Sequence, residues 1–221
     1  MFLLYSPRMT DDRKSGLALI AGSVAGIITM TLHPTGQHVL TPGQLESMAR
    51  MLVAVHALAL AGLPALFLGA WGLSRHVGTD DRIAFAALVT YTLALVAVMN
   101  AAVFDGLVAP AIIRQMADAA PSSTEMWHMM LNYNFRQNQA FAQLYVAASS
   151  VAIALWSISI ARSQTLARGV AIYGVVIAPI TLIALFSGHL RLNVHGFGAV
   201  MLSQAIWFIT AGVLLCRVRK I

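Results

Sequence analysis

The sequence predicts an all-α membrane protein, a bundle of six transmembrane helices with both termini in the cytoplasm. The first observation behind this prediction is the composition, because 59% of the 221 residues are apolar and only 10% are charged. Soluble domains carry about 25% charged residues, and a soluble protein this apolar could not cover its own surface. Most of the chain is therefore expected to contact the lipid bilayer.

The second observation is a set of apolar segments, each close to the ~20 residues that a helix needs to cross a bilayer. All are expected to be helices, because an isolated strand would leave its backbone groups unpaired in lipid. Together they form one transmembrane domain covering residues 1–221. The expected spans are about 16–32, 51–73, 83–104, 140–161, 169–186 and 196–216.

Two of these segments have informative ends. The first stops at His33-Pro34, because proline disfavours helical geometry in the residue before it. The third stays apolar past Phe104 as far as Ile113, with Asp105 and Gly106 interrupting it. That length is too great for one untilted crossing, so we expect a span to about Phe104 followed by a kinked or interfacial extension.

The charges in the connections predict the orientation. With six crossings the termini share a face, and that face holds ten of the fourteen Lys and Arg residues. The other four are Arg50, Arg114, Arg136 and Arg191. The positive-inside rule then places both termini in the cytoplasm. The long connections 33–50 and 105–139 become external, and we expect them to carry most of the irregular structure.

The connection 105–139 contains an expected amphipathic helix at about 123–139. Ser122 and Glu125 have the spacing of a capping box. A polar stripe then recurs every three or four residues and continues into the fourth span: His128, Asn132, Arg136, Gln139 and Gln143. This spacing places the stripe on one helix face. It indicates either a solvated face or a polar wall descending into a cavity.

Histidines are unevenly distributed between the two faces. Five of the seven fall in loops or helix ends on the external side, namely His33, His38, His128, His189 and His195. His56 lies about one turn inside the membrane from the same side, and only His76 is on the other side. Imidazole is costly near lipid, ligates metals and titrates near neutral pH. The one-sided placement therefore predicts a polar pocket on the periplasmic side.

Asp105 is the sharpest candidate for that pocket, because an ionisable side chain that ends a transmembrane run usually faces an interior or a cavity. It is either a simple interfacial carboxylate or a ligand, a general base or the partner of a histidine. The candidate metal ligands are His33, His56, Asp105, His189 and His195. Arg191 and His128 are candidate partners for an anion or a carboxylate. The alternative for each histidine is a solvated side chain or one bonded to a neighbouring helix.

The chemistry of such a pocket stays open. HExxH is absent, so a metal site has to be assembled from several helices. Zinc with Asp105 would suit a membrane hydrolase, and two axial histidines would suit haem. Thioethers with imidazoles suit copper, and methionines gather on the same side: Met30, Met48, Met51, Met126, Met129 and Met130. Nucleic acid is not an expected partner, because the basic residues form no stripe.

Several stretches resemble those of uncharacterised bacterial inner-membrane proteins, a six-span group known only as a domain of unknown function. The stretches are Ala21–Gly26, His33–Gly36, Ser187–Gly198 and Gln204–Phe208. The resemblance covers most of the chain and implies an integral membrane protein of bacterial type. It implies no activity and no catalytic residue.

The favoured functional prediction is a multi-pass membrane protein with a histidine-rich periplasmic pocket that binds a metal ion or a small ligand. One alternative is an accessory subunit of a membrane complex that has no site of its own. Another is a membrane enzyme, either a metal hydrolase or a haem or quinone oxidoreductase. Small residues such as Gly22 and Gly26 permit close helix packing within one bundle or in a homo-oligomer.

Overall fold

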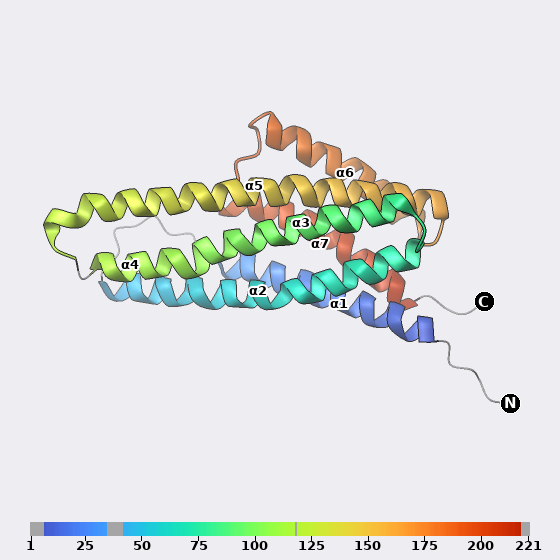
Figure 1. Cartoon of the computed structure of the whole chain (residues 1–221), viewed down its shortest axis with the longest axis horizontal. Coiled ribbons are helices and arrows are strands. Elements are labelled where there is room, and N and C mark those ends of the chain that lie inside the picture. Colours follow the sequence, from blue (N-terminus) through green and yellow to red (C-terminus); the bar gives the residue numbers. More distant parts are fainter. Residues whose placement is uncertain (1–6, 35–41, 118, 218–221) are drawn as a thin grey trace.

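The computed structural model describes residues 7–34, 42–117 and 119–217, which are almost entirely helical (Figure 1). Three short elements join α3 to α5: the π-helical turn η1 (Phe104–Val108), α4 (Ala109–Ala117) and the 3-10 turn η2 (Pro121–Ser123). The described residues contain no strand, which confirms the all-α class. The long helices are α1 (Pro7–Leu32), α2 (Pro42–Val77), α3 (Arg82–Val103), α5 (Thr124–Ser163), α6 (Arg168–Phe186) and α7 (Val194–Arg217).

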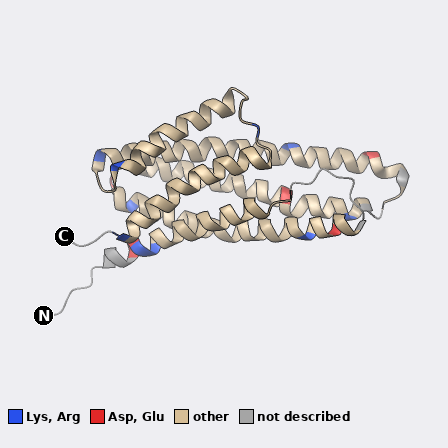
Figure 2. Cartoon of the chain, turned by 180° about the vertical axis from the view of Figure 1, so that it is seen from behind, with Lys and Arg blue, Asp and Glu red and all other residues tan. Residues whose placement is uncertain are grey.

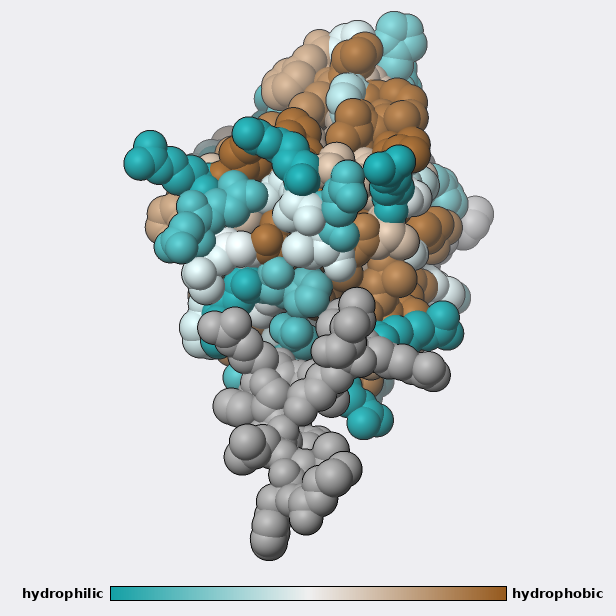
Figure 3. Space-filling model, turned by 90° about the vertical axis from the view of Figure 1, so that its right-hand side faces the viewer, coloured by the Kyte–Doolittle hydropathy of each residue, from teal (hydrophilic) through white to brown (hydrophobic). Residues whose placement is uncertain are grey.

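Within the described part of the chain, six helical segments are long and apolar enough to cross a membrane, with α3, η1 and α4 together forming one of them. This confirms the predicted bundle. α1 begins and α7 ends at the same end of the bundle (Figure 1), and hydrophilic residues gather on that end (Figure 3). From there to the level of the α6–α7 connection the helices carry no charged residue, and Figure 2 shows this uncharged section in tan.

Three helices continue beyond the end of α1 (Figure 1). We define the outer projection as residues 42–55 of α2, which precede His56, residues 109–117 of α4, which follow η1, and residues 124–133 of α5, which precede Asn134. α4 packs against both α2 and α5, and Arg114 Nε donates to Glu46 Oε2 at 3.0 Å to join α4 to α2. Residues 42–50 and 105–117 are therefore helical where irregular structure was expected, because mutual packing keeps these segments helical. The helix expected at about 123–139 is present as the first part of α5.

The start of α5 differs from the expected capping box. Ser123 is the N-cap residue, its side chain makes no capping hydrogen bond, and its hydroxyl donates instead to Ala120 O at 2.8 Å. The prediction of a capping box formed by Ser122 and Glu125 is thus wrong, because the preceding 3-10 turn moves the N-cap by one residue, to Ser123. The N3 position, where a capping box has its Glu, is then occupied by Met126.

The polar stripe along α5 lies on the outside of the bundle. His128, Asn132, Arg136 and Gln143 are exposed, and Gln139 is half-buried. The stripe is therefore a solvated face where α5 belongs to the outer projection, and it does not form the wall of a cavity.

Close packing of α1 on α2 sets the geometry from which the site is built. A Cβ placed on Gly22 of α1 would come within 2.6 Å of Leu66 Cγ in α2, so only glycine permits this approach. The larger side of the bundle is held by α5, which packs against α3 and α6. There Trp156 and Trp207 are fully buried and stack with ring centroids 6.0 Å apart.

Candidate metal centre

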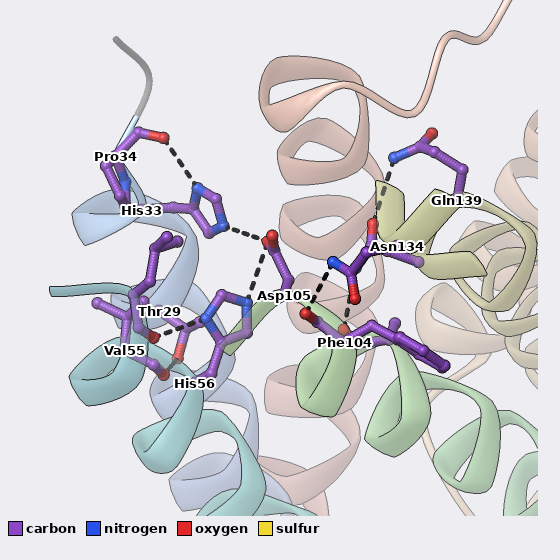
Figure 4. Close-up of polar contacts among 12 residues, drawn as sticks. Thr29, His33, Pro34, Val55, His56, Phe104, Asp105, Asn134 and Gln139 are labelled. Carbon is purple, nitrogen blue, oxygen red and sulfur yellow. Dashed lines mark hydrogen bonds and ion pairs between the residues drawn. The ribbon is translucent and has the colours of Figure 1, made fainter. Parts of the chain in front are cut away.

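Three side chains from three helical segments meet where α1 ends (Figure 4). His33 directly follows the last residue of α1, His56 belongs to α2, and Asp105 belongs to η1. The spanning part of α1, Asp11–Leu32, has 22 residues. At 1.5 Å per residue this is about 33 Å, close to the thickness of a bilayer core. A bilayer core crossed by this segment would end at the level of the three side chains, remote from the helix ends that carry the termini.

The three groups approach one another through three specific atoms. His33 Nε2 lies 3.0 Å from Asp105 Oδ2, and His56 Nε2 lies 3.4 Å from the same oxygen. One ligand atom from each residue lies within 4.8 Å of the other two. The two imidazoles meet edge to face, with ring centroids 5.2 Å apart. We call His33, His56 and Asp105 the triad.

Hydrogen bonds on the far side of each ring fix its orientation. His33 Nδ1 lies 3.1 Å from Pro34 O, and His56 Nδ1 lies 2.8 Å from Leu52 O. A carbonyl oxygen only accepts, so each Nδ1 carries a hydrogen and donates. In the neutral rings both Nε2 atoms are then acceptors that face the carboxylate. Three acceptors at these distances repel one another unless a cation, either a metal ion or a proton, lies among them.

The π-helical turn brings Asp105 to this position. One extra residue in the helix shifts the face on which the following side chains lie, and such turns occur frequently at functional sites. Gly106 completes the arrangement, because a Cβ there would come within 2.2 Å of His56 Cβ and 2.6 Å of His56 Cγ. Its hydrogen lets α2 pack against the turn closely enough for His56 to reach Asp105.

Two asparagines of α5 support the backbone around the turn. Asn134 Nδ2 donates to Phe104 O at 3.0 Å, and Asn138 Nδ2 donates to Ala101 O at 2.9 Å. Asn134 is only 5% exposed. On the other side of the triad, Thr29 Oγ1 donates to Val55 O at 3.1 Å and ties α1 to α2 next to both histidines. These contacts fix η1 against α5 on one side of the triad and α1 against α2 on the other.

Exposure of the triad is unequal. The side chains of His33 and His56 are 12% and 8% exposed, whereas that of Asp105 is 33% exposed. The carboxylate is therefore the most accessible of the three groups from outside the protein. Burial lowers the pKa of His33, but the hydrogen bond and the negative charge of Asp105 raise it more, so that this pKa lies above its ordinary value.

The remaining candidates do not join the triad. His189, His195, Arg191 and His128 are exposed, and His189 Nδ1 contacts the Ser187 hydroxyl at 2.8 Å. His195 shares only a hollow of about 400 Å³ with His33, between α1 and α7. His38 lies outside the described residues.

At the other end of the bundle, His76 Nδ1 lies 3.1 Å from Asp12 Oδ2. This pair joins α2 to α1 and contains a single histidine. It resembles the pair of His33 and Asp105 without a second histidine, so substitutions at His76 serve as controls for substitutions in the triad.

The sequence named all three members of the triad but not the residues that support it. In the sequence, Gly106 is recognisable only as an interruption of an apolar run. Asn134 and Asn138 gave no periodic signal that separated them from the solvated polar residues around them. Thr29 resembles any small residue of a membrane span.

No family model, no curated protein and no solved structure matches this chain. The geometry of the triad is therefore the observation from which a function has to be argued.

Proposed function

We propose that this is a multi-pass membrane protein that binds a divalent metal ion, zinc first, through His33 Nε2, His56 Nε2 and Asp105 Oδ2. The observation that carries the proposal is the convergence of these three acceptor atoms while both Nδ1 atoms donate to backbone carbonyls. Histidines that ligate metals usually donate their other ring N–H to a carbonyl or carboxylate in this way, which fixes the tautomer.

The distances also suit a small ion. Zinc binds imidazole nitrogen and carboxylate oxygen at about 2.0–2.2 Å, so the ligand atoms of a tetrahedral site lie about 3.3–3.5 Å apart. The contacts of 3.0 and 3.4 Å to Asp105 Oδ2 are close to this separation. Imidazole with carboxylate favours zinc, and two histidines with one carboxylate are also the ligand set of non-haem iron.

Three protein ligands leave a coordination position free for water or a small ligand, which is typical of catalytic rather than structural zinc sites. The partial exposure of Asp105 supports access to that position from outside the bundle. A free coordination position and an accessible carboxylate support a metal-assisted hydrolase over a haem protein. Here the chain's own contribution would be to hold and orient the metal at the membrane boundary.

The proposal includes a location and an orientation. The ten basic residues on the side of the termini support an orientation with both termini in the cytoplasm. The resemblance to bacterial inner-membrane proteins supports a bacterial inner membrane as the location. The triad and the outer projection would then be periplasmic. The stretches Ala21–Gly26, His33–Gly36, Ser187–Gly198 and Gln204–Phe208 support membership of the six-span bacterial group of unknown function.

A proton shared by His33 and Asp105 is the second candidate occupant. The raised pKa of His33 favours it, because the carboxylate stabilises the imidazolium. The triad would then respond to pH and have no metal. A titration with Zn²⁺ separates a bound metal ion from a shared proton.

We would titrate the purified full-length protein in detergent with Zn²⁺ by calorimetry and measure bound zinc by elemental analysis. Wild type should bind one equivalent of zinc. His33→Ala, His56→Ala and Asp105→Asn should each weaken binding by more than the roughly 10- to 100-fold typical of outer-shell changes. His76→Ala is the matched control, because it removes a histidine that also contacts a carboxylate, and it should bind zinc as wild type does.

Wild type that binds no zinc, or triad variants that bind it as well as His76→Ala does, would contradict the proposal. The two accounts left would then be a proton shared by His33 and Asp105 and an accessory subunit without a site of its own.

A further inference from the structure

The outer projection is unusually rich in methionine. Six of the eleven methionines of the chain lie in it, although it is a small part of the chain. They are Met48 and Met51 in α2, Met116 in α4, and Met126, Met129 and Met130 in α5.

The three methionines of α5 form an exposed stripe. Met126, Met129 and Met130 have the i, i+3, i+4 spacing that places side chains on one helix face. Their exposed fractions are 49%, 66% and 42%. We call these residues the methionine stripe.

With the bilayer core placed by the length of α1, the methionine stripe lies beyond the boundary at the triad. Asn134 is level with η1 and hence with the triad, and Met126 precedes it by eight positions. At 1.5 Å per residue the stripe extends up to about 12 Å past the triad. Lipid tails therefore do not account for exposed apolar side chains at this height.

The choice of residue distinguishes a metal-binding stripe from an ordinary apolar docking surface. Leucine is among the commonest residues of globular proteins, and any contact surface built only for burial would use it freely. The outer projection has three leucines, Leu45, Leu52 and Leu131, against six methionines. Methionine differs from leucine chiefly in its flexibility and in its thioether sulfur, a soft metal ligand.

We propose that the methionine stripe binds a soft monovalent cation, Cu⁺, through the thioether sulfurs of Met126, Met129 and Met130. Side chains three and four positions apart on a helix have Cβ atoms about 5–6 Å apart, and the flexible methionine side chain can bring its sulfur to a shared ion. Thioethers select Cu⁺ over harder ions. This site is separate from the triad in ligand type and in position, and it does not depend on the zinc proposal.

The test uses Ag⁺ as a stand-in for Cu⁺ that does not undergo redox chemistry, titrated into the full-length protein in detergent. The triple substitution Met126→Leu, Met129→Leu and Met130→Leu keeps the helix and the apolar surface but removes every sulfur donor of the stripe. It should weaken Ag⁺ binding by more than about tenfold, the lower limit for changes around a metal site. Met99→Leu is the control, since Met99 is an exposed methionine of α3, and it should leave Ag⁺ binding unchanged.

Three further measurements separate this site from the triad. His56→Ala should retain Ag⁺ binding, and the triple leucine variant should retain its response to Zn²⁺. A thioether has no proton to lose in water, so Ag⁺ binding should also persist at mildly acid pH, where imidazole ligands become protonated. Wild type that fails to bind Ag⁺, or a triple leucine variant that binds it as wild type does, would overturn the proposal and identify the stripe as an apolar surface.

Discussion

Gly106 lies directly against His56, so closely that a Cβ on Gly106 would come within 2.2 Å of the Cβ of His56. The contact is between parts of the chain that cannot rotate away, since one is backbone and the other is the first atom of a side chain. The position of the His56 ring relative to Asp105 therefore depends on a hydrogen at position 106. The same contact makes the packing of α2 on η1 sensitive to a single methyl group.

Gly106→Ala should accordingly separate α2 from η1. We expect zinc affinity to fall by more than about tenfold, as for other changes that misplace a ligand. Overpacking should also lower the free energy of unfolding by about 1–3 kcal/mol. Zinc titration and thermal unfolding in detergent measure the two effects. Gly43→Ala is the control, because a Cβ at that glycine of α2 meets nothing within 4 Å; equal zinc affinity in the two variants would count against this role for Gly106.

Asn134→Leu should impair the turn that holds Asp105 without touching the triad. The substitution keeps a similar volume but leaves the Phe104 carbonyl without the donor that Asn134 supplies at 3.0 Å. Losing a buried hydrogen-bond partner costs about 1–3 kcal/mol of stability. We expect weaker zinc binding as well, because η1 is then less well fixed. Asn132→Leu, at an exposed position of the same helix, should change neither quantity, and an Asn134→Leu protein with wild-type zinc affinity would show that η1 is held by other contacts.

The pH dependence of stability should reverse when zinc is added. Without metal, the raised pKa of His33 means that its pairing with Asp105 stabilises the fold fully below pH about 6.5. This contribution is lost as the pH rises through the raised pKa. With zinc, the imidazoles must be deprotonated to bind, so stabilisation by the metal increases with pH.

The pH dependence of stability can be measured by thermal unfolding of wild type and Asp105→Asn. Each protein is measured in chelator and in zinc, from mildly acid to neutral pH. The difference between the two proteins should decline with pH in chelator and increase with pH in zinc. The same slope in both conditions would rule out a cation site at the triad.

Asp81 provides a stability prediction that is independent of the triad. Its Oδ1 accepts hydrogen bonds from the backbone N–H of Ile83 at 2.8 Å and of Ala84 at 3.4 Å, which caps α3. The Ser159 hydroxyl donates to Oδ2. This hydrogen bond, helped by the two backbone donors, holds the pKa of Asp81 below its ordinary value despite the opposing effect of burial.

Asp81→Ala should lower the free energy of unfolding by about 1 kcal/mol, the typical effect of removing an N-cap. Because the pKa is lowered, the ionised carboxylate contributes stability above pH about 3.9 and loses it as the pH falls through the lowered value. Acid unfolding curves should therefore converge for the two proteins at low pH. Asp81→Asn retains a capping side chain and should lose less stability near neutral pH, and all three proteins should bind zinc equally.

The membrane architecture could be predicted from the sequence because it depends on quantities that are local along the chain. The length and hydropathy of a segment identify a candidate crossing without knowledge of its neighbours, and the charge of the loops predicts the orientation. The extra length of α2 and α5 could not be predicted in this way. It depends on α4 packing between them and on the ion pair of Arg114 with Glu46, which are contacts across segments far apart in sequence.

The candidate ligands were also identifiable, since His56 and Asp105 are costly residues in or at the edge of an apolar run. Their convergence was not, because it depends on the π-helical turn and on the missing side chain at Gly106. His189 and His195 illustrate the same limit from the other side. They carry the same chemistry at the same membrane face, but they are exposed and lie outside the triad.

An experimental structure of the zinc-soaked protein, with an anomalous difference map recorded at the zinc absorption edge, tests the central claim most directly. We expect one peak at about 2.0–2.2 Å from His33 Nε2, His56 Nε2 and Asp105 Oδ2, the distances of zinc to imidazole and carboxylate ligands. A map with no peak among these three atoms, while they keep their separations of 3.0 and 3.4 Å from the carboxylate oxygen, would contradict the account and leave a shared proton as the occupant.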